Sequence, residues 1–201
     1  MRVVLVDYGA GNLRSAENAL RAAGADAVDV TCQPEAVRAA ERIVLPGVGA
    51  FGQCIGAIRA IAGLEEALRE AVLERGRPFL GICVGMQLLA ATGHEFGTHA
   101  GLGWITGEVR RMEPADPACR IPQIGWNEVQ GSGLVERGWA YFVHSYAFRP
   151  ADRSAVVATI DHGGEVVAAV QAGPILGVQF HPEKSQRYGL ALLGRFLAWK
   201  P

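Results

Sequence analysis

The sequence predicts an α/β fold, in which a doubly wound, mostly parallel sheet is flanked by helices and the C-terminal half adds an antiparallel or mixed strand extension. In the first half, short continuous apolar runs alternate with amphipathic helical patterns, which is typical of parallel strands covered on both faces. After residue 91, short β-like segments replace the long helical patterns. The 201 residues are enough for one substantial core, so we expect a single domain spanning residues 1–201.

Composition excludes several classes of protein. Hydrophobic residues make up 50% of the chain, charged residues 19%, and the formal net charge is −1, which argues against nucleic acid or an anionic membrane as a partner. No apolar run reaches the length of a membrane span, and the N-terminal run that ends at Asp7 is typical of a strand, not of a signal peptide. The four cysteines lack CxxC spacing (Cys32, Cys54, Cys83 and Cys119). This spacing argues against a disulfide framework or a zinc site and favours a reducing, cytoplasmic location.

The first half contains the regular alternation of elements. Strands are predicted over residues 3–6, 28–31 and 42–45, and helices over 13–23, 35–40, 54–61 and 64–75. Gly24 suits the position just after the first helix. The turn Gly9-Ala10-Gly11 lacks the third glycine and the closing acidic residue of a dinucleotide site, which argues against that function.

Residues 77–89 are the most informative stretch of the chain. An apolar strand runs into a helix, and Cys83 stands at the junction with Gly81 and Gly85 two residues to either side. The glycines permit a sharp turn and a close approach of substrate to the backbone. The N–H groups that open the helix favour a thiolate and supply donors for an oxyanion. Cys83 is therefore a candidate nucleophile, and the alternative is a buried structural cysteine.

Other features gather at the same edge of the predicted sheet. A glycine-rich turn at residues 46–52 follows the third strand, and such a turn can form an anion-binding concavity or simply a plain loop. In doubly wound sheets the ligand crevice lies beyond the carboxyl ends of the strands. The loop after Val6, the glycine-rich turn and Cys83 all fall at those ends, so we expect the site there.

The second half is predicted to be a set of short strands. Residues 92–103 are predicted to be a loop, and β-like segments follow at 105–110, 123–129, 140–146, 156–160, 166–171 and 175–179. Residues 161–164 have the composition of a hairpin turn. An amphipathic helix begins at about Ser185 and closes the sequence.

A thiolate nucleophile needs a base, and the base needs an orienting acceptor. His181-Pro182-Glu183 follows the last predicted strand, and in an extended segment His181 and Glu183 project to the same side. The alternative for His181 is a solvent-facing turn residue, and His144, which has no adjacent carboxylate, is the competing base. The remaining histidines lie in loops without a matching pair of cysteines or acidic residues for a metal site: His94, His99 and His162.

Two motifs together resemble the signature of the class I (triad-type) glutamine amidotransferases, a family with a flavodoxin-like fold: GICVGMQ at 81–87 and QFHPE at 179–183. Within that superfamily, DYGAGNL at 7–13, LPGVGAF at 45–51, QIGWNE at 123–128 and HPEKS at 181–185 resemble one branch. That branch comprises the glutaminase subunits of imidazole glycerol phosphate synthase in histidine biosynthesis. The length resembles that of a free-standing subunit without a fused synthase domain.

The resemblance implies a catalytic triad. Cys83 would attack the side-chain amide of glutamine, and His181, oriented by Glu183, would protonate the leaving ammonia before water hydrolyses the thioester to glutamate. It also implies an oxyanion hole formed by backbone N–H groups of Val48, Gly49 and Val84. Glutamine would be held by Gln87 and Glu95, helped by Ser145 and Tyr146. The resemblance implies no cofactor and no metal.

The resemblance further implies a partner. Ammonia would pass to a (β/α)8-barrel cyclase subunit in a heterodimer, which forms imidazole glycerol phosphate and an aminoimidazole carboxamide ribotide. The implied interface residues are Asn12, Trp126, Tyr141 and Lys184. A lysine at the start of a helix is unfavourable against the helix dipole, which favours a partner carboxylate for Lys184.

Two alternatives remain at this stage. The chain could be a glutaminase that serves another synthase, such as the one that makes pyridoxal phosphate. It could also be a non-catalytic regulatory or binding module on the same fold, although the presence of Cys83, His181 and Glu183 argues against that hypothesis.

Overall fold

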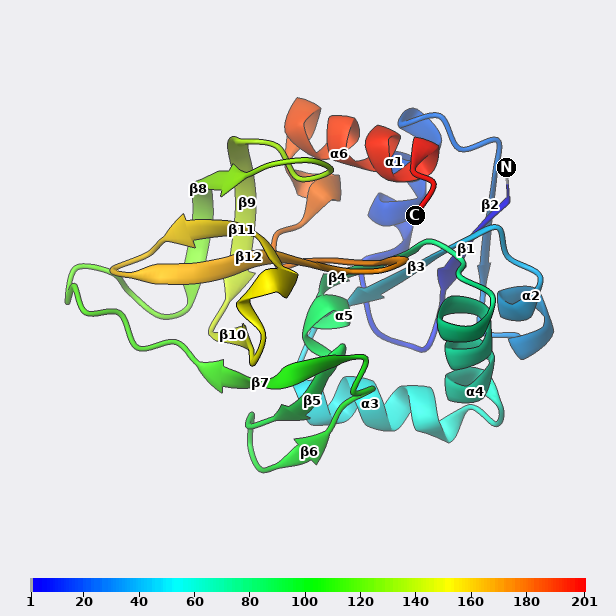
Figure 1. Cartoon of the computed structure of the whole chain (residues 1–201), viewed down its shortest axis with the longest axis horizontal. Coiled ribbons are helices and arrows are strands. Elements are labelled where there is room, and N and C mark those ends of the chain that lie inside the picture. Colours follow the sequence, from blue (N-terminus) through cyan, green and yellow to red (C-terminus); the bar gives the residue numbers. More distant parts are fainter. Residues whose placement is uncertain (1) are drawn as a thin grey trace.

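The computed structural model describes residues 2–201. Its N-terminal half alternates strands and helices (Figure 1). The strands are β1 (Arg2–Val6), β2 (Ala27–Thr31), β3 (Arg42–Gly47) and β4 (Phe79–Cys83), and the helices are α1 (Leu13–Ala22), α2 (Pro34–Arg38), α3 (Phe51–Ala60), α4 (Leu64–Arg69) and α5 (Val84–Gln87). A π-helical turn, Glu70–Glu74, extends α4.

The C-terminal half is mostly strands. These are β5 (Ala90–Gly93), β6 (His99–Ala100), β7 (Ile105–Arg111), β8 (Gln123–Gly131), β9 (Gly138–His144), β10 (Tyr146–Pro150), β11 (Val156–Asp161), β12 (Glu165–Ala172) and β13 (Ile175–Val178). Short 3-10 turns lie at Arg153–Ala155 and Pro182–Lys184, and α6 (Gln186–Ala198) follows the second of them. Every helix that the structure describes is too short or too polar to cross a membrane.

Within residues 2–201 the larger sheet has nine strands, in the order β2-β1-β3-β4-β13-β12-β11-β8-β9. The strands from β2 to β13 run parallel, and the pairings from β13 onward are antiparallel. A smaller sheet has the order β10-β7-β5-β6. The predicted parallel sheet with an antiparallel extension is therefore confirmed.

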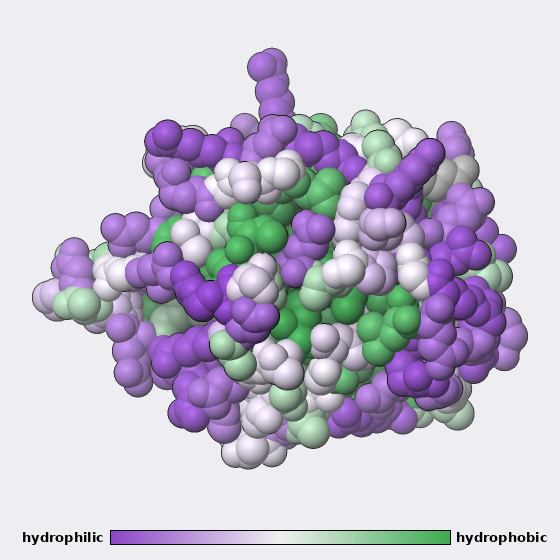
Figure 2. All heavy atoms as spheres, in the orientation of Figure 1, coloured by the Kyte–Doolittle hydropathy of each residue, from purple (hydrophilic) through white to green (hydrophobic). Residues whose placement is uncertain are grey.

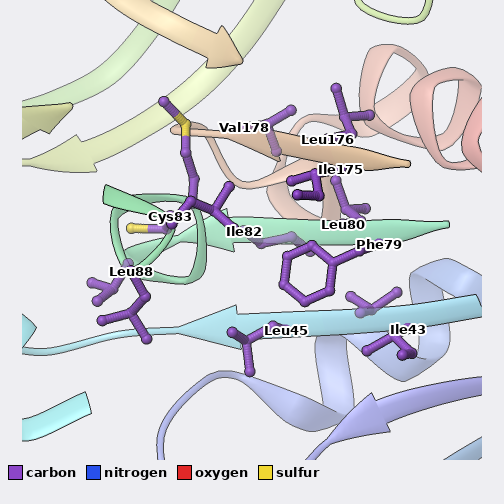
Figure 3. Close-up of a cluster of buried hydrophobic side chains, with 14 of the residues drawn as sticks. Ile43, Leu45, Phe79, Leu80, Ile82, Cys83, Leu88, Ile175, Leu176 and Val178 are labelled. Atoms are coloured by element: carbon purple, nitrogen blue, oxygen red, sulfur yellow. The ribbon is translucent and has the colours of Figure 1, made fainter. Parts of the chain in front are cut away.

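Burial explains why the apolar runs form the central strands. All residues of β4 and β13 are buried, as strands covered on both faces require. Helices α1 and α6 cover one face and α3 and α4 the other (Figure 1). Figure 3 shows the resulting core, in which Leu45, Phe79 and Leu176 lie on adjacent strands. On the outside, hydrophilic residues dominate the periphery of the viewed face and hydrophobic residues gather toward its middle (Figure 2).

Two predicted segments were wrong. The loop expected at 92–103 contains the end of β5 and all of β6, and the single strand expected at 140–146 is two strands, β9 and β10, in different sheets. The chain crosses between the sheets at Ser145, whose carbonyl accepts a hydrogen bond from Met112 N at 2.9 Å. Strand pairing with segments distant in sequence decides both features, and local apolar patterns do not reveal it.

Gly85 is required by close packing between α5 and β3. A Cβ at this position would lie 2.0 Å from Leu45 O, a backbone atom that cannot move independently. We expect Gly85→Ala to lower the free energy of unfolding by about 3 kcal/mol, at the upper end of overpacking effects. Gly56 is the control, because it is exposed on α3 and an added Cβ would meet no atom within 4 Å. Gly56→Ala should stabilise by about 0.5–1 kcal/mol. Urea unfolding measures both, and equal effects would contradict the packing argument.

Candidate active site

Cys83 sits at a strained junction between β4 and α5. Its φ of 55° and ψ of −112° lie outside the regions that non-glycine residues favour, a feature that concentrates at functional sites. The side chain is 4% exposed and lies at the end of β4, beyond the core residues of that strand (Figure 3). A Cβ on Gly81 would meet Gly85 O at 2.5 Å, so the elbow depends on the two flanking glycines.

His181 and Glu183 form a buried pair next to this cysteine. His181 Nδ1 lies 2.8 Å from Glu183 Oε1, and the two side chains are 5% and 4% exposed. Burial lowers the pKa of His181, but hydrogen bonds to the Cys83 thiol and to the Glu183 carboxylate outweigh it and raise the pKa to about 9. The imidazole is therefore protonated at neutral pH, which suits a thiolate–imidazolium pair.

One oxygen of the Glu183 carboxylate, Oε1, pairs with His181 Nδ1. Among residues 2–201, the second oxygen, Oε2, is buried and has no hydrogen-bond partner. The paired carboxylate, like the Cys83 thiol, favours the charged form of His181.

The local geometry that joins His181 to Glu183 differs from the prediction. His181 is extended, with φ −99° and ψ 99°, but Pro182–Lys184 form a 3-10 turn, so the strand alternation expected for this segment is wrong. Proline favours the first position of a helical turn, and the turn carries Glu183 back to the imidazole. His181 and Glu183 are in contact as expected, but a 3-10 turn and not strand alternation brings them together.

The backbone of His181 is fixed by the strand β9. His181 N donates to Tyr141 O at 3.0 Å, and the hydroxyl of Ser185 donates to His181 O at 2.7 Å. The same hydroxyl accepts from Tyr141 N at 3.0 Å. The segment that carries the histidine is therefore attached to β9 at two points, both on Tyr141, and the bond between Ser185 and His181 O stabilises the segment internally.

The glycine-rich turn lies beside the cysteine, because Gly47 pairs with Cys83 in the register of β3 and β4. The Tyr8 hydroxyl donates to Pro46 O at 2.7 Å, and the Cys54 thiol donates to Val48 O at 3.4 Å. A trans peptide directs its N–H opposite to its C=O. The N–H of Gly49 therefore points away from Cys54.

The residues expected to hold glutamine are placed in two groups. Glu95 Oε2 accepts a hydrogen bond from Phe51 N at 2.8 Å, at the start of α3 and next to the glycine-rich turn. Gln87 is buried, and its Nε2 donates to Tyr146 O and to Gln179 Oε1, both at 3.0 Å. Ser145 and Tyr146 lie at the junction of β9 and β10.

Gln179 is a site residue that sequence reasoning missed. It is 0% exposed, and its Nε2 lies 3.7 Å from Cys83 Sγ. The sequence did contain a signal, because Gln179 directly follows an apolar strand. It stands two residues before His181, just as Glu183 stands two residues after it.

His144, the competing base, is engaged elsewhere. Its Nδ1 lies 2.9 Å from Tyr146 O and its Nε2 lies 2.9 Å from Gln123 Oε1. Burial lowers the pKa of His144 to about 4, so the ring is neutral and one nitrogen must accept. Because Tyr146 O can only accept, Nδ1 donates to it. His144 has the role of a satisfied core histidine.

Of the residues expected at a partner interface, Trp126 on β8 is exposed and Tyr141 on β9 is half-buried, while Asn12 precedes α1 and Lys184 lies in the 3-10 turn. The rings of Trp126 and Tyr141 are 5.9 Å apart, and Lys184 Nζ is 6.0 Å from the Tyr141 ring. Two exposed residues on the same strands were missed by sequence analysis, Ile124 and Trp139, which are 64% and 57% exposed. Alternation along the strands puts them on the face of Trp126 and Tyr141.

Each of the remaining histidines, His94, His99 and His162, has a hydrogen-bond partner. His94 pairs with Glu108 at 2.9 Å, and His99 Nε2 lies 3.2 Å from Glu95 O. In the part of the chain that the structure describes, no group of three or more His, Cys, Asp and Glu residues is arranged to hold a metal ion. A cavity of about 340 Å³ lies between residues 147–150 and 162–167, and none of the predicted site residues lines it.

Comparison with known proteins decides the family. The model of the family described as glutamine amidotransferase class-I matches residues 4–198. The chain belongs to the class I glutamine amidotransferases. It is 57% identical over 205 residues to the imidazole glycerol phosphate synthase subunit HisH of Zymomonas mobilis, covering 99% of this chain and 96% of that protein. It is 50% identical over 214 residues to the HisH subunit of Rhodospirillum rubrum, with both proteins covered completely.

Solved structures share the fold at lower identity. The structure of PurLQS from Thermotoga maritima superposes with a TM-score of 0.74 at 21% identity, covering 98% of this chain and 97% of that one. A crystal structure described as a glutamine amidotransferase gives a TM-score of 0.72 at 24% identity, covering 95% and 98%. The expected class I amidotransferase fold is thereby confirmed.

Proposed function

We propose that this chain is the glutaminase subunit of an imidazole glycerol phosphate synthase in histidine biosynthesis, and that it hydrolyses glutamine to glutamate and ammonia. The observation that carries the chemistry is the contact of Cys83, at its strained elbow, with the buried His181–Glu183 pair. The relatives that are 57% and 50% identical over nearly the whole chain bear the name of that synthase subunit.

The triad supports a two-step mechanism. The Cys83 thiolate attacks the carbonyl carbon of the glutamine side chain, and the His181 imidazolium gives its proton to the departing nitrogen, so that ammonia leaves and a thioester remains. His181, now neutral, takes a proton from water, and the hydroxide attacks the thioester. Glutamate departs, and the proton on His181 restores the thiolate–imidazolium pair. Glu183 keeps the imidazole oriented and stabilises its charged form throughout.

Backbone N–H groups would stabilise the oxyanion of both tetrahedral intermediates. Val84 N–H opens α5 directly after the nucleophile. Val48 and Gly49 follow Gly47, the register partner of Cys83. Loss of one such donor typically costs about 10²–10³-fold in rate.

The substrate's polar ends would be held by residues around this elbow. The Glu95 carboxylate, next to the glycine-rich turn, suits the α-ammonium group of glutamine. Gln87 is joined to the Ser145 and Tyr146 segment by the hydrogen bond from Gln87 Nε2 to Tyr146 O, and these residues would help to hold the substrate.

The ammonia would be delivered to a cyclase subunit of (β/α)8-barrel type, in a cytoplasmic heterodimer. The aromatic surface of Trp126 and Tyr141, with Lys184 beside it and Asn12 near Glu183, is the proposed docking region. Exposed apolar side chains gathered on one face often mark a protein interface. Since Tyr141 O also accepts a hydrogen bond from His181 N, the docking surface is in direct contact with the segment that carries the catalytic histidine.

Glutamate release by the purified chain tests this function, alone and with the cyclase subunit and its nucleotide ligand. We expect the cyclase to raise the rate and Trp126→Ala to weaken binding at least about tenfold, as removal of a central aromatic anchor does. Leu73→Ala removes another exposed apolar side chain, 46% exposed in the π-helical turn, and should leave binding unchanged. Strong activity that the cyclase does not alter, or activation by the pyridoxal phosphate synthase partner instead, would overturn the proposal.

A further inference from the structure

A buried carboxamide, outside the triad, faces the nucleophile. Gln179 follows β13, and its backbone N–H donates to Ala168 O on β12 at 2.8 Å, so the residue is fixed to the sheet. Its side chain is 0% exposed, and its Nε2 lies 3.7 Å from Cys83 Sγ. A completely buried amide stays satisfied only if both its ends have partners.

The orientation of this amide follows from one atom whose hydrogen-bonding role is unambiguous. Tyr146 O is a backbone carbonyl and can only accept, so the end of the Gln87 amide that faces it at 3.0 Å must be the NH2 group. The same Gln87 Nε2 lies 3.0 Å from the Gln179 amide. The Gln179 atom at that contact must therefore be the oxygen, which leaves the NH2 group of Gln179 facing the sulfur.

We propose that Gln179 is a positioning residue that donates a hydrogen bond to the Cys83 thiolate, and that Gln87 keeps its amide in the donating orientation. The sulfur then has two donors, the imidazolium of His181 and the carboxamide of Gln179, both carried by the segment after β13. This inference rests on the proposed function only for its effect on turnover. The hydrogen bond itself concerns the ionisation of Cys83 and can be measured without glutamine.

A hydrogen bond to the charged form of a group favours that form. Removal of the Gln179 donor should therefore make the thiolate harder to form and leave the sulfur less well oriented for attack. The other titratable groups around Cys83 stay in place in such a variant. They are His181 after β13, Tyr8 after β1 and Cys54 on α3. Glu183 acts on the cysteine through His181, and Glu95 interacts electrostatically with Cys54.

The decisive measurement is the pH dependence of Cys83 alkylation by iodoacetamide, followed on the Cys83 peptide by mass spectrometry between about pH 5 and pH 10, the range over which thiols in proteins ionise. For Gln179→Leu we expect the alkylation midpoint to rise by about one pH unit, and kcat/KM for glutamine to fall at least about tenfold, as loss of a hydrogen bond to a charged group predicts. Gln130→Leu is the matched control, because the Gln130 amide is exposed and donates to Glu128, away from Cys83. It should leave the midpoint unchanged.

Two further variants keep the test decisive. Gln179→Asn retains a polar side chain but withdraws the donor by one methylene group, and should shift the midpoint in the same direction even if Gln179→Leu folds poorly. Gln87→Leu should shift the midpoint less, and should add nothing to the shift in the double variant with Gln179→Leu. A midpoint in Gln179→Leu and Gln179→Asn equal to that of the wild type would overturn the inference. Failure of the wild-type chain to hydrolyse glutamine even with the cyclase subunit and its nucleotide ligand would refute the proposed function while leaving the titration interpretable.

Discussion

Cys83→Ala should abolish glutamine hydrolysis, with a fall in kcat of at least about 10⁴-fold, because every later step depends on the covalent intermediate. The substitution removes one sulfur atom from a junction whose close packing depends on Gly81 and Gly85, so the fold and the binding of the cyclase should persist. Steady-state release of glutamate measures the effect. Thermal unfolding and co-purification with the cyclase verify that the variant is intact.

The control for this substitution is a cysteine outside the site. Cys119 is a half-buried free cysteine in the loop between β7 and β8, and Cys119→Ala should retain full activity. Cys83→Ser should be as inactive as Cys83→Ala, because a serine hydroxyl is not ionised by this imidazole. Normal hydrolysis by Cys83→Ala would refute the nucleophile.

Glu183→Gln should lower kcat by about 10³–10⁴-fold while leaving the fold intact, as replacement of the orienting carboxylate does in other triads. The glutamine is isosteric, so the distance of 2.8 Å to His181 Nδ1 can be kept. The substitution removes the negative charge that stabilises the imidazolium. It also removes the acceptor that keeps the proton on Nδ1, so that the other ring nitrogen can exchange a proton next to the sulfur.

The pH dependence of the same variant separates this role from a merely structural one. In the wild type, the pKa of His181 is raised to about 9, so the imidazolium persists at neutral pH and activity should fall as the pH rises through about 9. Without the carboxylate the pKa of His181 decreases, and the alkaline limit of activity should move to lower pH. Glu136→Gln, which removes a surface partner of Arg195, should leave that limit in place. An unshifted limit in Glu183→Gln would contradict the assignment.

The raised pKa of His181 also has a consequence for stability, whose sign is fixed by linkage. A histidine that binds its proton more tightly in the folded state stabilises that state fully below its unfolded pKa of about 6.5. This contribution disappears as the pH rises through the folded pKa of about 9. Buried His144, with its pKa lowered to about 4, acts in the opposite direction, because its stabilising effect is lost as the pH falls from about 6.5 toward 4.

Several features could be predicted from the sequence because they depend on local chemistry. The apolar runs of β1, β3 and β4 and the helical pattern of α1 are visible within a single element, and burial on both faces follows from them. The elbow at Cys83 is indicated by its two flanking glycines. The pairing of His181 with Glu183 was predicted from two residues in one short segment, although a 3-10 turn brings them together.

Other features depend on contacts between distant segments, and only the tertiary structure decided them. The switch from β9 to β10 at Ser145 and the strands β5 and β6 arise from pairing with other elements. The orientation of the Gln179 amide depends on Gln87 and on the carbonyl of Tyr146, which come from elements far apart in the chain. A carboxamide has no intrinsic preference for which end faces a sulfur, so its role is set by the partner that folding places at its other end.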